Sequence, residues 1–245
     1  NEVLGKASGF FVNKHNKAIS ITGRGENVDF SALMIQYCPE VKTLYNSQHL
    51  PLILNANVNS DDLLDLGSNG LSRFNFSEKV FTKLSLLYPS EKVDAETLFN
   101  FIYGVLHSPE YRIRFKNNLS KSFSRIPFPT DYKKFEEFAL KGEKLGQIHL
   151  SFDEVKKYEI EVKQGNLALA HVEDPRSFFR VEQMKFANKG DKSTVIYNKN
   201  ITIENIPLEA YEYVVNGKPA LEWVMERQCV KTDKASGIVN DANDY

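Results

Sequence analysis

A cluster of basic side chains after Ser108 is the part of the sequence best suited to bind phosphate groups. From Tyr111 to Lys134 the chain holds seven Lys or Arg residues and one Asp, a local charge of +6 in a chain of net charge −1. On a single helix, residues at steps of three and four share a face. A helix with one apolar and one basic face can dock on a core and present cations to phosphates. The basic face would hold Arg114, Asn118, Lys121 and Arg125, and the apolar face Tyr111, Phe115 and Leu119.

Two interpretations of these basic residues remain open, because an ordinary solvated helix face carries similar charges. Arg24 raises the same question. It stands between Gly23 and Gly25, and a loop tip of this kind can bring an arginine to a base edge or a phosphate. A plain turn explains the two glycines equally simply. The charge pattern alone does not decide between binding and a solvated surface.

The glycine-containing stretch 63–70 resembles the turn by which many methyltransferases hold S-adenosylmethionine. Such a turn requires a strand before it and a helix directly after it, so that backbone N–H groups reach the ligand. Here Asp61 and Asp62 precede the turn, and residues 71–76 make a poor helix start. We therefore expect an exposed loop rich in Asn and Gly.

The histidines and cysteines do not indicate a metal site or a nucleophile. The five histidines show no H-x-x-x-H or H-x-H spacing, and Cys38 and Cys229 lie far apart. His107 and His149 follow apolar helical stretches and are expected at helix ends. The sequence also lacks a G-x-S-x-G elbow and a G-x-x-x-x-G-K-[ST] phosphate loop. We therefore expect no catalytic residue and no cofactor in this chain.

Helices flanked by strands are expected to position the basic residues. Apolar spacing predicts a helix at 95–107, a second helix beginning after Ser108, and a third at about 131–145. Strands are predicted by short β-branched or apolar runs at 9–12, 18–22, 32–37 and 50–54, and again at 158–162 and 193–203. A last helix is expected at about 219–228. This order predicts an α+β fold with an N-terminal strand-rich part, a central helical segment at about 95–150, and C-terminal strands plus a helix.

Length and composition exclude several classes of protein. A chain of 245 residues with 42% hydrophobic and 26% charged residues can bury a core, and it is neither disordered nor fibrous. Its balanced charge excludes a uniformly basic coat but permits a local basic patch. No apolar run approaches a membrane span and no signal peptide opens the chain, so we expect a cytoplasmic protein without a membrane partner. The first residue is Asn1, not Met, which suggests a fragment of a longer polypeptide.

From about residue 99 onward, the chain carries several stretches that together are specific for one protein family, although no single stretch would identify it. They are Phe101 to Arg112, Arg125 to Pro127, Leu145 to Leu150, Thr194 to Asn198, Ile206 to Tyr211, Tyr213 to Gly217, Leu221 to Arg227 and Val230 to Asp241. Together they resemble the C-terminal specificity domain of Type ISP restriction–modification enzymes. Residues 21–23 and 30–33 resemble the part just before it, and the resemblance is weakest at 55–95 and 150–180.

In that family one long polypeptide carries a nuclease, a helicase-like ATP-driven translocase, an N6-adenine methyltransferase and a target-recognition domain. The resemblance implies that this chain is the last of these parts and is not itself an enzyme. Residues 1–75 would form the strand-rich part of the recognition region and residues 76–245 the specificity domain. The resemblance also implies double-stranded DNA and the methyltransferase domain of the same polypeptide as partners. S-adenosylmethionine, ATP and Mg²⁺ would belong to the parent chain.

A recognition domain supplies basic side chains for phosphates and polar side chains for base edges. The resemblance transfers no base-contacting residue, so the DNA-binding residues are expectations from charge and position. Two alternatives stay open: a complete small methyltransferase using the loop at 65–70, and a structural docking module without base readout. The expected DNA-binding residues are Arg24, Arg73, Arg112, Arg114, Asn118, Lys121, Arg125, Lys231 and Lys234.

Overall fold

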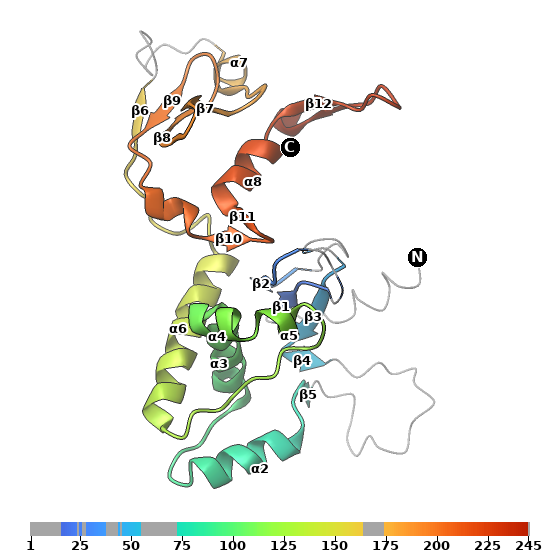
Figure 1. Cartoon of the computed structure of the whole chain (residues 1–245), viewed down its shortest axis with the longest axis vertical. Coiled ribbons are helices and arrows are strands. Elements are labelled where there is room, and N and C mark those ends of the chain that lie inside the picture. The colour runs from blue at the N-terminus through green and yellow to red at the C-terminus, as the bar shows by residue number, and fades with distance from the viewer. Residues whose placement is uncertain are drawn as a thin grey trace. The chain divides into compact units, whose positions relative to one another are not determined.

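A computed structural model of the chain describes residues 16–23, 25, 28–37, 44, 46–54, 73–163 and 174–244. The chain divides into two compact units, Asn1–Val155 (unit 1) and Lys156–Tyr245 (unit 2), each with its own hydrophobic core (Figure 1). Antiparallel strands occur towards both ends and helices in the middle, so the predicted α+β class is confirmed. The predicted division between residues 75 and 76 stays a prediction.

A three-stranded antiparallel sheet opens unit 1. Its central strand β1 (Ala18–Ile21) lies between β2 (Ala32–Ile35) and β3 (Gln48–Pro51), and Ala18 pairs with both Ile35 and Pro51. All four residues of β1 are buried: Ile19 and Ile21 give one face of the strand its large apolar side chains, and Ala18 and Ser20 give the other face small ones. Strands β4 (Ile53–Leu54) and β5 (Arg73–Phe74) form a separate pair. The strands predicted at 18–22 and 32–37 are confirmed in place. The single strand predicted at 50–54 is wrong, because the chain bends at Leu52 and divides this stretch between β3 and β4, which belong to different sheets. The strand predicted at 9–12 lies outside the described residues.

Helices α2 (Glu78–Leu87), α3 (Ala95–His107) and α6 (Tyr132–Leu150) are the three longest helices described in unit 1. Helix α3 has the predicted bounds, and its start is fixed by Asp94, whose carboxylate accepts from the backbone N–H of Thr97 at 2.8 Å. Helix α6 continues to Leu150, beyond the predicted end at about residue 145. Helices α3 and α6 pack side by side (Figure 1).

The core of unit 1 joins these helices to the first sheet. Phe101 of α3 is fully buried and stacks on Phe135 of α6, with ring centres 4.3 Å apart. Tyr103 is also fully buried, and its hydroxyl oxygen accepts from the backbone N–H of Met34 in β2 at 2.9 Å. Because α3 is tied both to α6 and to the sheet, it positions the chain that follows it from Ser108 onward.

Unit 2 is built around a four-stranded antiparallel sheet with the order β6-β9-β8-β7. The hairpin predicted at 193–203 is confirmed, because Ile196 in β8 pairs with Thr202 in β9. The last predicted helix is α8, and a final hairpin, β12–β13, follows it. The elements are β6 (Glu161–Lys163), α7 (Pro175–Phe179), β7 (Lys185–Asn188), β8 (Asp191–Ile196), β9 (Thr202–Glu204), η2 (Leu208–Tyr211), β10 (Val214–Val215), β11 (Lys218–Pro219), α8 (Ala220–Arg227), β12 (Val230–Thr232), β13 (Val239–Asp241) and η3 (Ala242–Asp244).

Candidate nucleic-acid interface

The basic residues of unit 1 follow a helix start at Ser108, as predicted. The Ser108 hydroxyl accepts from the backbone N–H of Tyr111 at 3.3 Å and caps helix α4 (Pro109–Arg114). The prediction of one continuous helix to residue 125 is wrong: α4 ends at Arg114, the backbone leaves the helical conformation at Phe115, and α5 (Lys116–Leu119) follows as a separate short helix. Beyond it, the hydroxyls of Ser120 and Ser122 donate to backbone carbonyls, and such local bonds compete with helix continuation.

The apolar side of this segment packs inwards despite the break. Tyr111 and Leu119 are buried, and Phe115 is half-buried against the core of unit 1. The Tyr111 hydroxyl donates to the backbone carbonyl of Arg125 at 3.0 Å. This bond fixes the non-helical stretch that carries Arg125 close to α4.

The predicted basic face is exposed to solvent. The side chains of Arg114, Asn118, Lys121 and Arg125 are exposed, and the Arg114 guanidinium lies 5.6 Å from the ring centre of Phe115. In the described part of the chain, no carboxylate forms an ion pair with Arg114, Lys121 or Arg125. These three cations therefore remain available to an anionic partner.

The loop between β1 and β2 packs against α5. The backbone N–H of Gly25 donates to the Ser120 carbonyl at 3.0 Å, and Lys116 forms an ion pair with Asp29 at 3.5 Å. Gly25 has a φ of +78°, a backbone conformation that favours glycine. Arg24 itself lies outside the described residues. Its neighbour Gly25 is bonded to Ser120, so this part of the loop lies next to Lys121. Charge patterning did not predict that these two distant parts of the sequence lie together.

Arg112 differs from the other predicted site residues because its side chain is held by the protein. Its Nε donates to the Leu106 carbonyl at 2.7 Å, and its Nη2 lies 3.3 Å from the Nδ1 of His107. The guanidinium also lies 5.9 Å from the ring centre of Phe30 in the β1–β2 loop. Arg112 thus connects the end of α3 to this loop, and its contact with DNA stays a prediction.

His107 is expected to make unit 1 sensitive to acid. Burial, followed by the charges of Arg112 and His149, lowers the pKa of His107 to about 3. An unfolded chain takes up this proton near pH 6.5, so the contribution of His107 to stability is complete above that pH and is lost as the pH falls towards 3. The urea midpoint should therefore fall between about pH 7 and pH 4, and less steeply in His107→Phe. Identical pH slopes for both proteins would contradict this.

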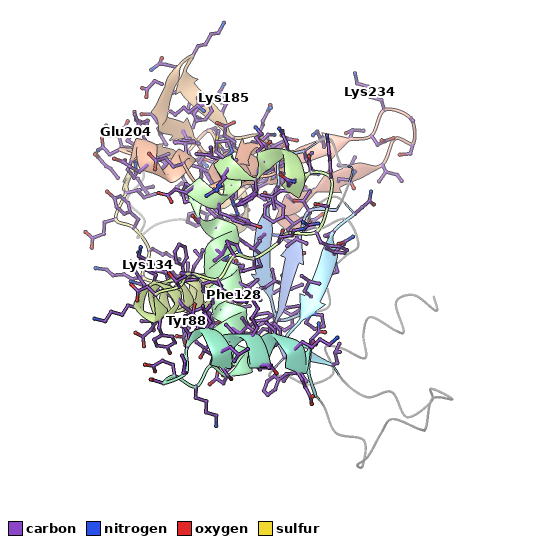
Figure 2. All side chains as sticks on the ribbon, turned by 60° about the horizontal axis from the view of Figure 1, so that its bottom comes forward. Tyr88, Phe128, Lys134, Lys185, Glu204 and Lys234 are labelled. Atoms are coloured by element: carbon purple, nitrogen blue, oxygen red, sulfur yellow. The ribbon has the colours of Figure 1, made fainter. Side chains whose placement is uncertain are left out.

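The other predicted residues either belong to unit 2 or have side chains that are not among those described. The backbone of Arg73 forms part of β5, and its side chain is not among those described. Lys231 and Lys234 belong to the β12–β13 hairpin of unit 2, and both are exposed (Lys234 is labelled in Figure 2). The link between these strands is ordered by the Asp233 carboxylate, which accepts from the backbone N–H groups of Ala235 and Ser236 at 3.0 and 2.8 Å.

A pocket of about 260 Å³ lies beside α4 in unit 1. Arg114 and Lys134 bring positive charge to its lining, and Phe115 and Phe128 contribute aromatic rings (Lys134 and Phe128 are labelled in Figure 2). Among the described residues, no group of three or more His, Cys, Asp or Glu side chains is arranged to hold a metal ion. The glycine-containing stretch 63–70 lies outside these residues. Glu110 also lines the pocket, so its two cations face one carboxylate and the lining keeps a positive balance that suits an anionic partner.

A family model for the Type ISP C-terminal specificity domain matches residues 8–245. The chain belongs to this family. A nuclease-deletion mutant of the Type ISP restriction-modification enzyme LlaGI, in complex with a DNA substrate mimic, is 33% identical with a TM-score of 0.71, over 97% of this chain and 19% of that one. The ATP-dependent Type ISP enzyme LlaBIII bound to DNA is 35% identical with a TM-score of 0.74, over 93% of this chain and 14% of that one.

A third similar structure, from a DrdV–DNA complex, is 24% identical with a TM-score of 0.75, over 93% of this chain and 21% of that chain, and it supports the fold alone. This specificity-domain chain therefore spans about a fifth or less of the length of the three solved proteins. Among curated proteins no sequence match was found. Within the described part of the chain, no helix has the length and apolar character needed to cross a bilayer.

Proposed function

We propose that the chain recognises a DNA target for a Type ISP restriction–modification enzyme. The observation that carries this proposal is the family match over residues 8–245, which covers both compact units. The similarity to LlaGI and LlaBIII, both solved with DNA or a DNA mimic, supports it. The exposed cations Arg114, Lys121 and Arg125 give the proposal a physical basis in unit 1, since they suit phosphate groups.

The proposed role is to hold duplex DNA in register for chemistry performed by other domains. A methyltransferase must flip its target adenine out of the duplex, and it can select the right base only if the flanking duplex is fixed. Phosphate contacts fix the register, and contacts to base edges provide the sequence preference. In this proposal the chain has no catalytic role of its own. Its partner is a methyltransferase domain of the same polypeptide. S-adenosylmethionine, ATP and Mg²⁺ are bound by other domains of the parent enzyme.

The basic surface of unit 1 is expected to bind DNA through its phosphates. Replacing Arg114 and Lys121 together with alanine should lower affinity for all duplexes by a similar factor, because phosphates carry no sequence information. The slope of log affinity against log salt should fall by about 0.9 for each phosphate that the variant no longer binds. Fluorescence anisotropy between about 50 and 200 mM salt measures both quantities.

The matched control replaces two exposed lysines of unit 1 that belong to other helices and do not line the pocket beside α4, Lys79 in α2 and Lys144 in α6. The double variant Lys79→Ala/Lys144→Ala removes the same charge and should bind DNA like the unaltered chain. If the Arg114/Lys121 variant behaved like this control, the surface would be an ordinary solvated face. If it lost affinity for one sequence only, these side chains would read bases rather than phosphates.

A further inference from the structure

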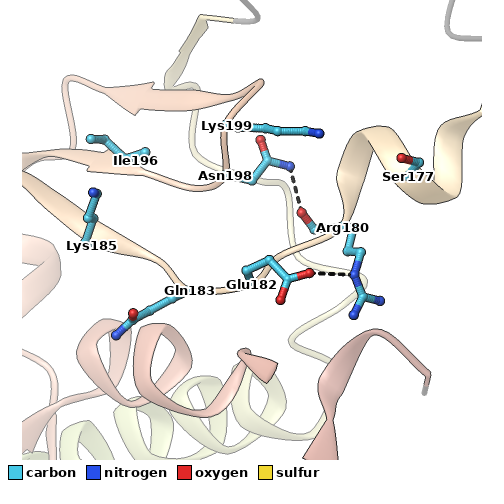
Figure 3. Close-up of a pocket in the computed structure, with 8 residues that line it drawn as sticks. All are labelled: Ser177, Arg180, Glu182, Gln183, Lys185, Ile196, Asn198 and Lys199. Atoms are coloured by element: carbon cyan, nitrogen blue, oxygen red, sulfur yellow. Dashed lines mark hydrogen bonds and ion pairs between the residues drawn. The ribbon is translucent and has the colours of Figure 1, made fainter. Parts of the chain in front are cut away.

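Unit 2 contains a pocket of about 370 Å³, lined mostly by residues with polar or charged groups, at the β7 side of its four-stranded sheet (Figure 3). Its walls come from α7, the link to β7, β7 itself, the end of β8 and the turn that leads to β9. None of its residues was among those expected from the sequence to bind DNA. The lining residues are Ser177, Arg180, Glu182, Gln183, Lys185, Ile196, Asn198 and Lys199.

Asn198 holds the walls of this pocket together. Its amide nitrogen donates to the carbonyls of Phe178 and Arg180 at 2.8 and 3.0 Å, and its amide oxygen accepts from the backbone N–H groups of Asn200 and Ile201, both at 2.8 Å. The bond to Arg180 is drawn in Figure 3. All of these polar atoms already have partners, so Asn198 is part of the framework and is not free to bind a ligand.

Arg180 also belongs to the framework. Its guanidinium donates to Glu182 at 2.8 Å and to Asp241 of β13 at 2.5 Å, so two carboxylates balance its charge. Hydrogen bonds from Asn243, together with Arg180, lower the pKa of Asp241 to about 2, and this carboxylate therefore stays ionised at neutral pH. The Arg180 network joins the pocket wall to the last hairpin of unit 2.

Three lining side chains do not take part in this framework: Lys185, Lys199 and Gln183. All three side chains are exposed, and within the described ranges neither ammonium group forms an ion pair and the Gln183 amide has no hydrogen-bond partner. Among the described residues that line the pocket, Glu182 is the only carboxylate, and it is already paired with Arg180. The pocket therefore offers two free cations and one free amide from a fixed framework.

This combination favours nucleic acid over a simple anion. A lysine ammonium binds phosphate as a point charge, whereas a glutamine amide can pair in a bidentate manner with the N6 and N7 atoms of adenine in the major groove. A free phosphate would use the lysines alone. A DNA strand presents phosphates and base edges together, and so it uses all three side chains.

We propose that this pocket is a DNA-reading site, in which Gln183 contacts a base edge while Lys185 and Lys199 hold neighbouring phosphates. The proposal rests on the proposed function and adds to it a residue that determines sequence preference. Gln183→Ala should weaken the preference at one position, or two adjacent positions, of the bound sequence by about 5- to 150-fold and leave the other positions unchanged. Lys185→Ala/Lys199→Ala should instead weaken binding to every sequence and lower the salt slope by about 1.8.

The test uses the whole chain and a pool of duplexes with a randomised central stretch, and the bound fraction is sequenced. Asn188→Ala is the matched control for Gln183, because Asn188 is an exposed amide of β7 outside the pocket lining. Lys157→Ala/Lys189→Ala is the control for the lysine pair, since both residues are exposed in unit 2 and neither lines the pocket. Both controls should select the same sequences as the unaltered chain, with the same affinity.

Three outcomes overturn the proposal. If the Gln183 variant keeps the full preference at every position, Gln183 does not read a base, although the proposed function stands. If the lysine-pair variant binds as its control does, the pocket holds no phosphates, and again the proposed function stands. If the unaltered chain itself selects no sequence, the proposed function and this inference fail together.

Discussion

Replacing Phe101 with alanine is expected to lower the free energy of unfolding of unit 1 by about 3–5 kcal/mol. The ring is fully buried and lies between Phe135 and Phe128, with ring centres 4.3 and 5.7 Å away. Its removal leaves a cavity where α3 meets α6, and these two helices cannot both move to close it. Urea denaturation followed by circular dichroism measures the loss.

Phe115→Ala is the control for this effect because it removes the same ring from a half-buried position at the end of α4. If Phe115 were fully buried, its replacement would lower the free energy of unfolding by a similar amount. Because Phe115 is partly exposed, we expect a clearly smaller loss. Equal losses for the two variants would show that burial in the α3–α6 core does not determine the effect.

Gly142→Ala is expected to destabilise unit 1 by about 3 kcal/mol, although alanine favours helix over glycine. A Cβ atom at Gly142 of α6 would overlap the backbone carbonyl oxygen of Asn100 in α3 and come within 2.7 Å of the backbone nitrogen of Gly104. Both obstacles are backbone atoms, so the two helices would have to separate.

Gly146→Ala, one turn further along α6, provides the comparison. There a Cβ atom would meet the sulfur and terminal carbon of Met34, at 2.7 and 2.8 Å, and these atoms form the flexible end of a side chain. We expect a small change in the urea midpoint for Gly146→Ala and a large one for Gly142→Ala. Similar midpoints for the two variants would contradict the close backbone contact.

Local patterns predicted the elements that are determined locally. The spacing of apolar residues and the cap at Asp94 set the bounds of α3, and the β8–β9 hairpin follows from two short strands separated by an amide-rich turn. The break at Phe115 was not predicted, because the apolar and basic residues keep helical spacing across it. The serine hydroxyls of Ser120 and Ser122 bond to backbone carbonyls only beyond this break, where they accompany the end of α5.

The candidate site was only partly predictable, because some of its residues are close together in the sequence and others are not. Charge patterning identified the exposed cations of unit 1, such as Arg114 and Lys121, because they are close together in the sequence. It did not identify the pocket of unit 2, whose residues come from separate elements between Ser177 and Lys199. The only local signal there is the polar run Asn198–Lys199–Asn200, and polar turns of this kind are common.

The bonds of Asn198 have a consequence for how the target specificity of this domain can change. Asn198 is bonded to backbone atoms at Phe178, Arg180, Asn200 and Ile201, and none of these bonds involves the side chain at position 183. Exchange of that one residue leaves the supporting bonds in place. If Gln183 reads a base as proposed, a new target preference can therefore be selected from a library of variants at this single codon without disturbing the bonds of Asn198.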